Sequence, residues 1–429
     1  MTPSSRQVAV EVVWQGERGA QVDWLLDECL ARAGHPKWAP RATALTYGTL
    51  RLIARLDYVL QPLLDRPLGD LEPLLRAILR VGCYELLFTA ETTPAAAVHS
   101  LVDLAQDREW GGHVGIGRLT NAVLRRVAGA AEEMRRPPSG WPAFQMLTQW
   151  WSLPPWISER WLSRWGDQRA LEQAAAAATE PSVCLRVNRT RATRDQVIER
   201  LVAAEIEAQP SDLHPAGVRL TGGAPARLPG WADGWFTVQD EASLAIADLV
   251  GAEPGLRVID LCAAPGGKAT QLAETGCELV AVDIDRGRLD RLRDTADRLG
   301  LRFETVCGDA RTMPGRLEPA DAVLLDAPCT GSGTLARRPD LRWRLGPERL
   351  ATAVKIQRSI LLAAVKLLRP GGRLIYSTCS LEAEENEDQM AWLAREHPEI
   401  LPTAEPDTTT FPVAGRHDGF FSAVRRRRD

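Results

Sequence analysis

The chain has 429 residues, of which 45% are hydrophobic and 25% charged, and its formal net charge is −4. This length predicts two or three domains, and the composition is typical of an ordinary globular protein. The net charge gives no support to a nucleic-acid partner, so such a function has to be argued from local motifs. No apolar run approaches the length of a membrane span, and the amino terminus lacks a signal-peptide core. We therefore expect a cytoplasmic protein with no membrane partner.

The eight cysteines form neither a CxxC pair nor a dense framework. Their spacing argues against a zinc site and against a disulfide scaffold, so we expect no bound metal. In a reducing cytoplasm these thiols are free for chemistry.

The first part of the chain, residues 6–128, has apolar residues at helical spacing, beginning with Val8, Val12 and Val13. Prolines at positions 62, 67, 73 and 94 fall where helices are expected to start or stop. These patterns predict an all-α bundle. By itself, such a bundle says nothing of function.

The middle of the chain changes character twice. Residues 129–155 are rich in Pro, Gly and Trp, which predicts a linker followed by a short docking segment. Two strand candidates, Val183–Val187 and Gly217–Leu220, then flank a helix candidate at Arg194–Ala204, which predicts a small α+β module. Arginines near the end of the first strand could contact phosphates or be merely solvated, and the sequence leaves this open for Arg186, Arg189 and Arg191.

From Val238 onward, apolar strand candidates alternate with helical segments such as Arg286–Leu299 and Glu348–Leu368. This alternation predicts a mostly parallel sheet covered on both faces. The strand candidates are Val258–Leu261, Leu279–Val282, Phe303–Val306, Ala322–Leu325, Arg373–Ser377 and Phe420–Val424. A basic tail, Arg425–Arg428, could favour RNA, although terminal charge runs are usually just solvated.

The stretch Val258–Ala273 reads as a strand, a turn at Pro265-Gly266-Gly267, and the start of a helix. Doubly wound α/β folds bind nucleotide-like ligands at such a turn. A phosphate-binding Walker loop would need glycine at position 262, where the chain has Cys262. The turn also lacks the G-x-G-x-x-G pattern of dinucleotide-binding sites. The ligand is therefore expected to be of another kind.

Acidic residues occur at the ends of four successive strand candidates, at Asp260, Asp283, Asp309 and Asp326. In a parallel sheet these ends border one crevice. A single Asp in such a place is more often a helix N-cap, but four of them favour a ligand site. Asp283 suits a ribose diol, Asp309 an adenine amine and Asp326 an ammonium group. Together they fit S-adenosylmethionine better than a pyrophosphate ligand.

Two cysteines, Cys329 and Cys379, follow strand candidates directly and should open onto the same crevice. An isolated cysteine is usually a small buried apolar residue, but two thiols beside a methyl-donor site point to chemistry. Methylation of cytosine at carbon 5 requires a thiolate, since addition to carbon 6 makes carbon 5 nucleophilic. The residues alone leave open which of the two thiols attacks.

Four motifs resemble those of the RNA (cytosine-5)-methyltransferases: Asp260–Lys268, Asp326–Gly333, Arg338–Trp343, and Ser377–Ser380 with Glu384-Glu385-Asn386. The first 130 residues resemble the NusB-like RNA-binding domain in three segments, Arg6–Ala9, Leu74–Leu86 and Leu119–Arg125. The combination is similar to the members of that family that act on small-subunit (16S) rRNA.

The resemblance implies roles for individual residues. Cys379 is expected to attack the cytosine, Cys329 to assist product release, and Asp326 to stabilise charge at ring nitrogen 3. Asp285 stays an alternative to Asp283 for the ribose, because the turn before the second strand is short. The residues expected to bind the donor are Cys262, Ala263, Ala264, Pro265, Gly266, Gly267, Lys268, Asp283, Asp309 and Asp326.

We therefore expect three parts: a NusB-like all-α bundle at 1–135, a linker with a ferredoxin-like α+β module at 136–234, and a Rossmann-like α/β methyltransferase domain at 235–429. The expected function is S-adenosylmethionine-dependent methylation of 16S rRNA by a monomer during ribosome biogenesis. The alternatives are a tRNA cytosine-5 methyltransferase with the same chemistry, and a non-catalytic NusB-like RNA-binding factor. The intact glycine turn, carboxylates and thiols argue against the second alternative.

Overall fold

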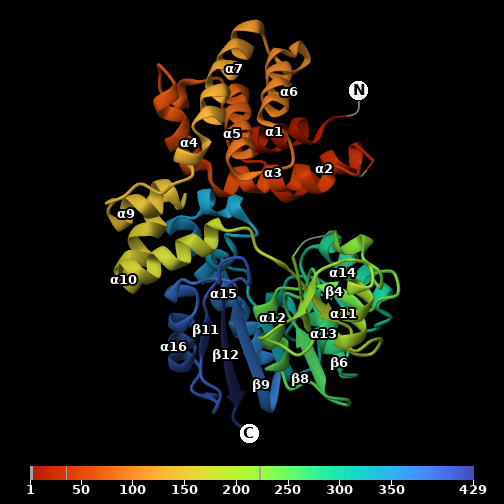
Figure 1. The fold of residues 1–429 in the computed structure, drawn as a ribbon. Helices are drawn as coiled ribbons and strands as arrows, with labels where there is room; N and C mark the ends of the chain where they lie inside the picture. Colours follow the sequence, from red (N-terminus) through yellow and green to blue (C-terminus); the bar gives the residue numbers. More distant parts are fainter. Residues whose placement is uncertain (1–2, 35, 222–223) are drawn as a thin grey trace. The chain divides into compact units, whose positions relative to one another are not determined.

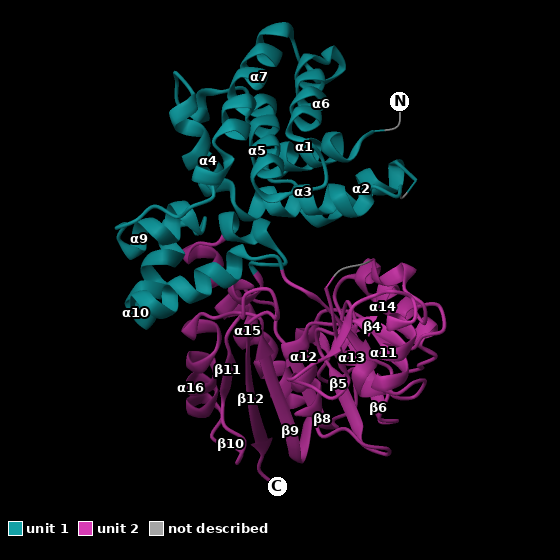
Figure 2. Ribbon diagram, viewed as in Figure 1, with its two compact units in different colours: residues 1–180, 335–344 teal, residues 181–334, 345–429 magenta. Residues whose placement is uncertain are grey.

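The computed structural model of the chain describes residues 3–34, 36–221 and 224–429. It divides into two units (Figure 2). The helical unit contains residues 1–180 and also a short later segment, 335–344, while the α/β unit contains residues 181–334 and 345–429. The chain thus leaves the α/β unit after Thr334 and returns to it at Leu345.

The helical unit is built on an amphipathic bundle, as its sequence predicts. Pro73 and Pro94 each occupy the first turn of a helix, where the missing N–H costs nothing. The central helix, α5, is buried along nearly its whole length. The helices are α1 Ser5–Gly16, α2 Val22–Arg32, α3 Ala39–Arg51, α4 Ile53–Leu60, α5 Pro73–Phe88, α6 Pro94–Gln106, α7 Val114–Gly129, α8 Ala131–Met134, α9 Ala143–Gln145 and α10 Pro155–Ala178.

Residues 129–155, which the sequence marks as a linker and a short docking segment, contain more helical structure than expected, and a long helical segment follows them. A π-helical turn at Met146–Trp150 leads to the long segment α10, which bends at Gly166, a residue with φ of +74°. The small residues of α10, including a run of alanines, favour helix but carry no clear amphipathic pattern. For that reason periodicity did not reveal this helix.

The segment 335–344 joins the helical unit through a buried arginine, Arg342. Its guanidinium donates to the carbonyl oxygens of Arg51 at 2.6 Å, Ala177 at 2.7 Å and Leu335 at 3.0 Å. Arg51 in turn donates to the carbonyl of Ala336 at 2.9 Å and 3.0 Å. Burial lowers the pKa of Arg342 to about 9, so it remains charged at neutral pH.

The α/β unit begins with the small module. Its antiparallel sheet has the strand order β2-β3-β1-β4. The apolar residues of β1 and β3 pack against Val197 and Leu201 of α11. The predicted strands have the bounds expected from alternation, and the two short strands β2 and β4 were not predicted. The elements are β1 Val183–Val187, α11 Arg194–Val202, β2 Ala208–Pro210, β3 Gly217–Leu220 and β4 Phe236–Val238.

The large sheet is Rossmann-like, as predicted, with five parallel strands and an antiparallel last strand (Figure 1). Its order is β10-β12-β9-β8-β5-β6-β7, and β11 pairs with β12. The strands are β5 Arg257–Asp260, β6 Glu278–Asp283, β7 Glu304–Cys307, β8 Ala320–Asp326, β9 Leu368–Thr378, β10 Ile400–Pro402, β11 Thr408–Thr410 and β12 Phe420–Arg427. The helices are α12 Glu241–Asp248, α13 Gly267–Ala273, α14 Arg286–Leu299, α15 Pro347–Lys366 and α16 Glu387–Glu396.

Both faces of this sheet are covered, because successive side chains of a strand point to opposite sides. Val258 lies in the core with α12, α13 and α14, whereas its neighbour Ile259 lies in the core with α15 and α16. On β6, Leu279 likewise lies in the core with α12, α13 and α14, and Val280 lies in the core with α15 and α16. This arrangement leaves the carboxyl ends of the parallel strands as the place where a ligand can bind.

The predicted basic tail is wrong for most of its length. Arg425 to Arg427 belong to β12 and pair with β10 and β9. Arg425 is buried and pairs with Asp407 at 2.6 Å, and Arg427 donates to the carbonyl of Leu368. These arginines thus belong to an antiparallel strand between β10 and β9. The sequence does not reveal this, because charge patterning carries no information about the partners of a charged residue.

Candidate active site

A cavity of about 330 Å³ lies at the carboxyl ends of β5 and β8. All seven turn residues that the sequence assigns to donor binding, Cys262 to Lys268, line this cavity. Asp260 and Asp326 line it as well, together with Gln239 and Ser243 from the start of α12. The glycine turn and two of the four strand-end carboxylates are therefore brought together as predicted.

The geometry of the turn requires glycine at position 266 and leaves little room for a side chain at position 267. Gly266 has a φ of +108°, and a Cβ atom there would lie 2.8 Å from the side chain of Leu292. Gly267 begins α13, and a Cβ atom there would lie 3.3 Å from Gln239, which lines the cavity. The backbone can thus approach a ligand closely only because both residues lack a side chain.

Lys268 and Asp326 form an ion pair across the cavity, with Nζ and Oδ2 2.7 Å apart. The other carboxylate oxygen of Asp326 accepts a hydrogen bond from Ser377 at 2.7 Å. Burial opposes the charge of Lys268, but the contact with Asp326 outweighs it and raises the pKa of the ammonium. Asp326 on β8 is paired in register with Ser377 on β9. Its contacts with Lys268 and Ser377 therefore hold its carboxylate where these two strands end.

Asp260 is a buried carboxylate at the cavity whose charge is poorly compensated. Its Oδ1 has no hydrogen-bond partner among the described residues. Burial, with the nearby charge of Asp326, raises the pKa of Asp260 to about 7. A buried carboxylate with an unpaired oxygen, lining a cavity, suits a ligand that brings a positive charge or a hydrogen-bond donor.

This raised pKa gives a testable result. Asp260→Asn should stabilise the ligand-free protein more at pH 8 than at pH 5, with a difference on the order of 2 kcal/mol. The carboxyl group of Asp260 loses its proton near pH about 4 in the unfolded chain but only near pH about 7 in the folded protein. Between these pH values the folded state holds one more proton, so wild-type stability falls as the pH rises. Asparagine removes this loss. Thermal unfolding at both pH values measures the effect, with Asp290→Asn at an exposed helix position as control. An equal gain at pH 5 and pH 8 would contradict it.

The other two strand-end carboxylates do not line the cavity. Asp283 is buried beside the turn and accepts hydrogen bonds from the backbone N–H of Ala264 at 3.1 Å and of Asp285 at 3.0 Å. Asp285 instead caps α14 by accepting from the N–H of Arg288. Asp309 is paired with Arg311, which lowers the pKa of its carboxyl group.

Cys329 and Cys379 lie side by side, with their sulfur atoms 3.2 Å apart. Cys379 directly follows β9, and Cys329 follows the neighbouring strand β8 by three residues. The hydrogen bond to Cys379, together with burial, raises the pKa of the Cys329 thiol far above its ordinary value. A thiolate at Cys329 is therefore disfavoured while Cys379 is its neighbour. The ammonium of Lys268 interacts electrostatically with Cys379, which links the thiol pair to the cavity.

Comparison with known proteins agrees with this geometry. Residues 249–424 match the family model described as 16S rRNA methyltransferase RsmB/F, residues 3–129 match the NusB family, and residues 153–227 match the ferredoxin-like domain of RsmF/B-like methyltransferases. The chain is 34% identical to the probable ribosomal RNA small subunit methyltransferase B of Synechocystis, and the match covers 98% of each chain. The chain belongs to the RsmB/F family of 16S rRNA methyltransferases.

Further relatives agree with this membership. The ribosomal RNA small subunit methyltransferase B of Klebsiella pneumoniae is 35% identical over 89% of each chain. Among solved structures, the one described as PH0851 matches the whole of both chains at 28% identity with a TM-score of 0.80. A methyltransferase homologue from Pyrococcus horikoshii is 26% identical, covers 67% of this chain and 99% of its own, and has a TM-score of 0.59. The predicted family, three-part fold and enzyme class, an rRNA methyltransferase, are confirmed.

A buried scaffold fixes the thiol pair of this RsmB/F family member. Glu385 is fully buried and accepts from the N–H of Thr330 at 2.9 Å and from Gln357 at 2.9 Å. Gln357 also donates to the carbonyl of Pro328 at 3.1 Å, directly before Cys329. The loop that carries Cys329 is thus held through its backbone on both sides of the thiol.

The loop that carries Cys379 is fixed in the same manner. Thr378 donates to Asn386 at 2.6 Å, and Asn386 donates to the carbonyl of Ser380 at 2.9 Å. The carbonyl of Cys379 itself accepts from the N–H of Gly333 at 2.9 Å. The sequence gives these residues only as parts of family motifs, because hydrogen bonding across separate loops has no local sequence signal.

Five cavity-lining residues were also missed: Thr237, Val238, Gln239, Ser243 and Thr295. Gln239 and Ser243 follow a three-residue strand that periodicity cannot detect, so the sequence did not connect them with the turn. Within residues 3–34, 36–221 and 224–429, no group of three or more His, Cys, Asp or Glu side chains is arranged to hold a metal ion. In the same described part of the chain, no helix is both long enough and apolar enough to span a bilayer.

Proposed function

We propose that the chain uses S-adenosylmethionine to methylate carbon 5 of a cytosine in 16S rRNA, with Cys379 as nucleophile. The observation that carries this proposal is the 3.2 Å approach of the Cys379 and Cys329 sulfur atoms beside the glycine-turn cavity. One thiol is enough for a single nucleophilic addition. A second thiol in contact with it suits a reaction in which the nucleophile must be expelled again.

The cavity fits a methyl donor of this kind. Its volume of about 330 Å³ lies within the range of roughly 300–1,000 Å³ that small-molecule sites occupy. Asp260 and Asp326 bring negative charge to a ligand that carries an ammonium and a sulfonium group. Gly266 and Gly267 let the backbone approach it, and the backbone N–H groups at the start of α13 can donate to its polar atoms. When bound, S-adenosylmethionine supplies an electrophilic methyl group.

We assign Asp283, beside the turn, to the ribose, and Asp309 to the adenine. Asp285 is the weaker candidate for the ribose, since its carboxylate serves as the N-cap of α14. Asp283 bonds the N–H of Ala264, a residue of the turn itself, and is therefore adjacent to the cavity although it does not line it.

The target cytosine is activated by addition of the Cys379 thiolate to carbon 6, which turns carbon 5 into an enamine carbon that takes up the methyl group. We assign the stabilisation of the charge at ring nitrogen 3 of the adduct to Asp326, which is fixed by Lys268 and Ser377. The carbon-5 proton must then leave before the sulfur–carbon-6 bond breaks, and we assign Cys329 to this release step.

The remaining domains fit a structured RNA substrate. A cytosine has to be unstacked before a thiolate can reach carbon 6, and proteins that act on RNA bases achieve this by holding the surrounding strand. We infer that the NusB-like bundle and the ferredoxin-like module hold the rRNA. The family match to 16S rRNA methyltransferases favours this substrate over tRNA.

Methyl transfer from radiolabelled donor to naked 16S rRNA, to assembled small subunits and to tRNA tests the proposal. We expect one 5-methylcytosine per 16S rRNA molecule, identified by nuclease digestion and mass spectrometry. Transfer to tRNA alone would favour the tRNA enzyme. Donor binding by calorimetry without transfer to any of the three RNAs would contradict the proposed substrates, and absence of donor binding would favour a non-catalytic RNA-binding factor.

A further inference from the structure

Arg186 lies on β1 of the small module, yet its side chain reaches the donor turn. The residue is 1% exposed, so it cannot contact a phosphate, one of the two roles left open by the sequence. Its Nη1 donates to the carbonyl oxygen of Gly267 at 2.6 Å and to Oε1 of Gln239 at 3.1 Å. Its Nη2 donates to the hydroxyl of Thr270 at 2.9 Å. One guanidinium thus bonds the first residue of α13 and a residue one turn later.

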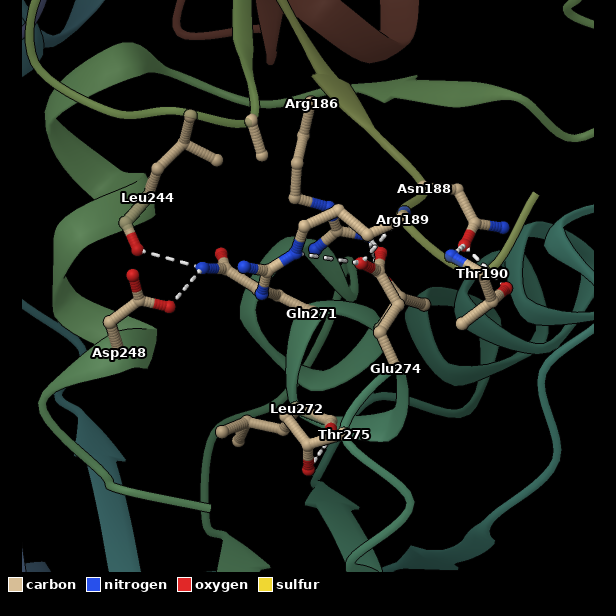
Figure 3. Close-up of polar contacts among 12 residues, drawn as sticks. Arg186, Asn188, Arg189, Thr190, Leu244, Asp248, Gln271, Leu272, Glu274 and Thr275 are labelled. Atoms are coloured by element: carbon tan, nitrogen blue, oxygen red, sulfur yellow. Dashed lines mark hydrogen bonds and ion pairs between the residues drawn. The ribbon is translucent and has the colours of Figure 1, made fainter. Parts of the chain in front are cut away.

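The same guanidinium also reaches the other end of α13. Glu274, the C-cap residue of this helix, lies 3.0 Å from Nη2 of Arg186, and its side chain is 2% exposed (Figure 3). Burial lowers the pKa of Arg186 to about 10 and raises that of Glu274. The arginine therefore stays charged at neutral pH, and the two buried groups compensate each other. Both ends of the seven-residue helix α13 are held by one side chain from the small module.

Arg186 also contacts the wall of the cavity through its hydrogen bond to Gln239. Gln239 lines the cavity, accepts from Arg186 and donates to Gln271 at 3.1 Å. Gln271 donates in turn to Asp248 at 3.0 Å and to the carbonyl of Leu244 at 2.9 Å, both on α12 (Figure 3). Both polar atoms of the Gln239 amide are therefore occupied, which fixes the side chain against Gly267.

We propose that Arg186 is a positioning residue for methyl-donor binding, which sets the glycine turn and the Gln239 wall of the cavity from the small module. This inference rests on the proposed function, because it takes the cavity to be the donor site. It also gives the small module a second role besides holding RNA. Displacement of the module from the sheet would remove Arg186 from the turn and weaken donor binding.

Arg186→Met should raise the dissociation constant of S-adenosylmethionine by roughly 10- to 100-fold, which is the loss of affinity seen when an outer-shell partner is removed from a metal site. Calorimetry with the donor and with S-adenosylhomocysteine measures it, and circular dichroism and thermal unfolding report the folded fraction. The matched control is Arg219→Met, since Arg219 is an ion-paired arginine on the neighbouring strand β3 that pairs with Asp212. The control should bind the donor as the wild type does.

Arg186→Met also leaves the carboxylate of Glu274 buried without its arginine, which lowers stability for a purely structural reason. The double variant Arg186→Met/Glu274→Leu removes that carboxylate. If Arg186 positions the turn, the double variant should recover thermal stability and still bind the donor weakly, with the KM for the donor raised and the KM for rRNA unchanged. Recovery of donor affinity together with stability would overturn the positioning role, as would wild-type affinity in folded Arg186→Met. Failure of the wild-type protein to bind the donor would instead overturn the proposed function.

Discussion

Cys379→Ala should abolish methyl transfer to rRNA, lowering the rate by at least about 10⁴-fold, while donor binding stays within about twofold of wild type. Without the thiolate, carbon 5 of cytosine is not nucleophilic, so the methyl group has no acceptor. The residue does not line the donor cavity, and its loop is held by Thr378, Asn386 and Gly333 through atoms that alanine keeps. Single-turnover methylation and calorimetry measure the two quantities.

The control for this variant is Cys277→Ala. Cys277 is also half-buried, but it lies just before β6, at the amino end of the strand and away from the site. This control should methylate rRNA as the wild type does. Normal turnover by Cys379→Ala would show that another group activates the cytosine.

Cys329→Ala should accumulate a covalent complex between protein and rRNA. If Cys329 assists the release step, the adduct of Cys379 with carbon 6 forms and receives its methyl group but cannot break down. The complex is expected as a slowly migrating band on a denaturing gel, present in the majority of the protein after one turnover. Treatment with ribonuclease should shift the band toward the free protein.

The double variant Cys329→Ala/Cys379→Ala identifies the thiol that attacks. It should give no covalent band, because the nucleophile is missing. A band with Cys379→Ala and none with Cys329→Ala would reverse the two roles. The distance of 3.2 Å between the sulfur atoms makes such an exchange geometrically possible, so the gel has to decide it.

The sheet and its donor turn could be predicted from the sequence because both depend on local patterns. Helix α14 has the predicted bounds, Arg286–Leu299, since Asp285 caps its start and Gly300 ends it in the left-handed conformation. The strands β5 and β6 lie within one residue of the predicted segments at each end, since they are apolar runs between turn residues. The turn residues line the cavity because a strand, two glycines and a helix prescribe that geometry.

Features that depend on distant partners could not be predicted. Arg186 and Arg425 look like solvated surface arginines in the sequence, yet each is buried and paired with a carboxylate outside its own local pattern, Glu274 and Asp407 respectively. Local patterns likewise do not reveal that Glu385 is buried and that its carboxylate holds the Cys329 loop. Charge alone gives a residue's capacity to pair and does not reveal the partner.

The excursion of residues 335–344 into the helical unit has a consequence for dissecting this protein. A fragment that ends near residue 180 would lack Arg342, and the carbonyl groups of Arg51 and Ala177 would lose their buried donor. A fragment that starts near residue 180 would contain residues 335–344 but lack the helices against which they pack. No single cut can therefore yield two intact halves, and a helical fragment should fold better when a peptide spanning 335–344 is supplied or joined to it by a linker. The helical unit is therefore assembled from two separate segments of the sequence, 1–180 and 335–344.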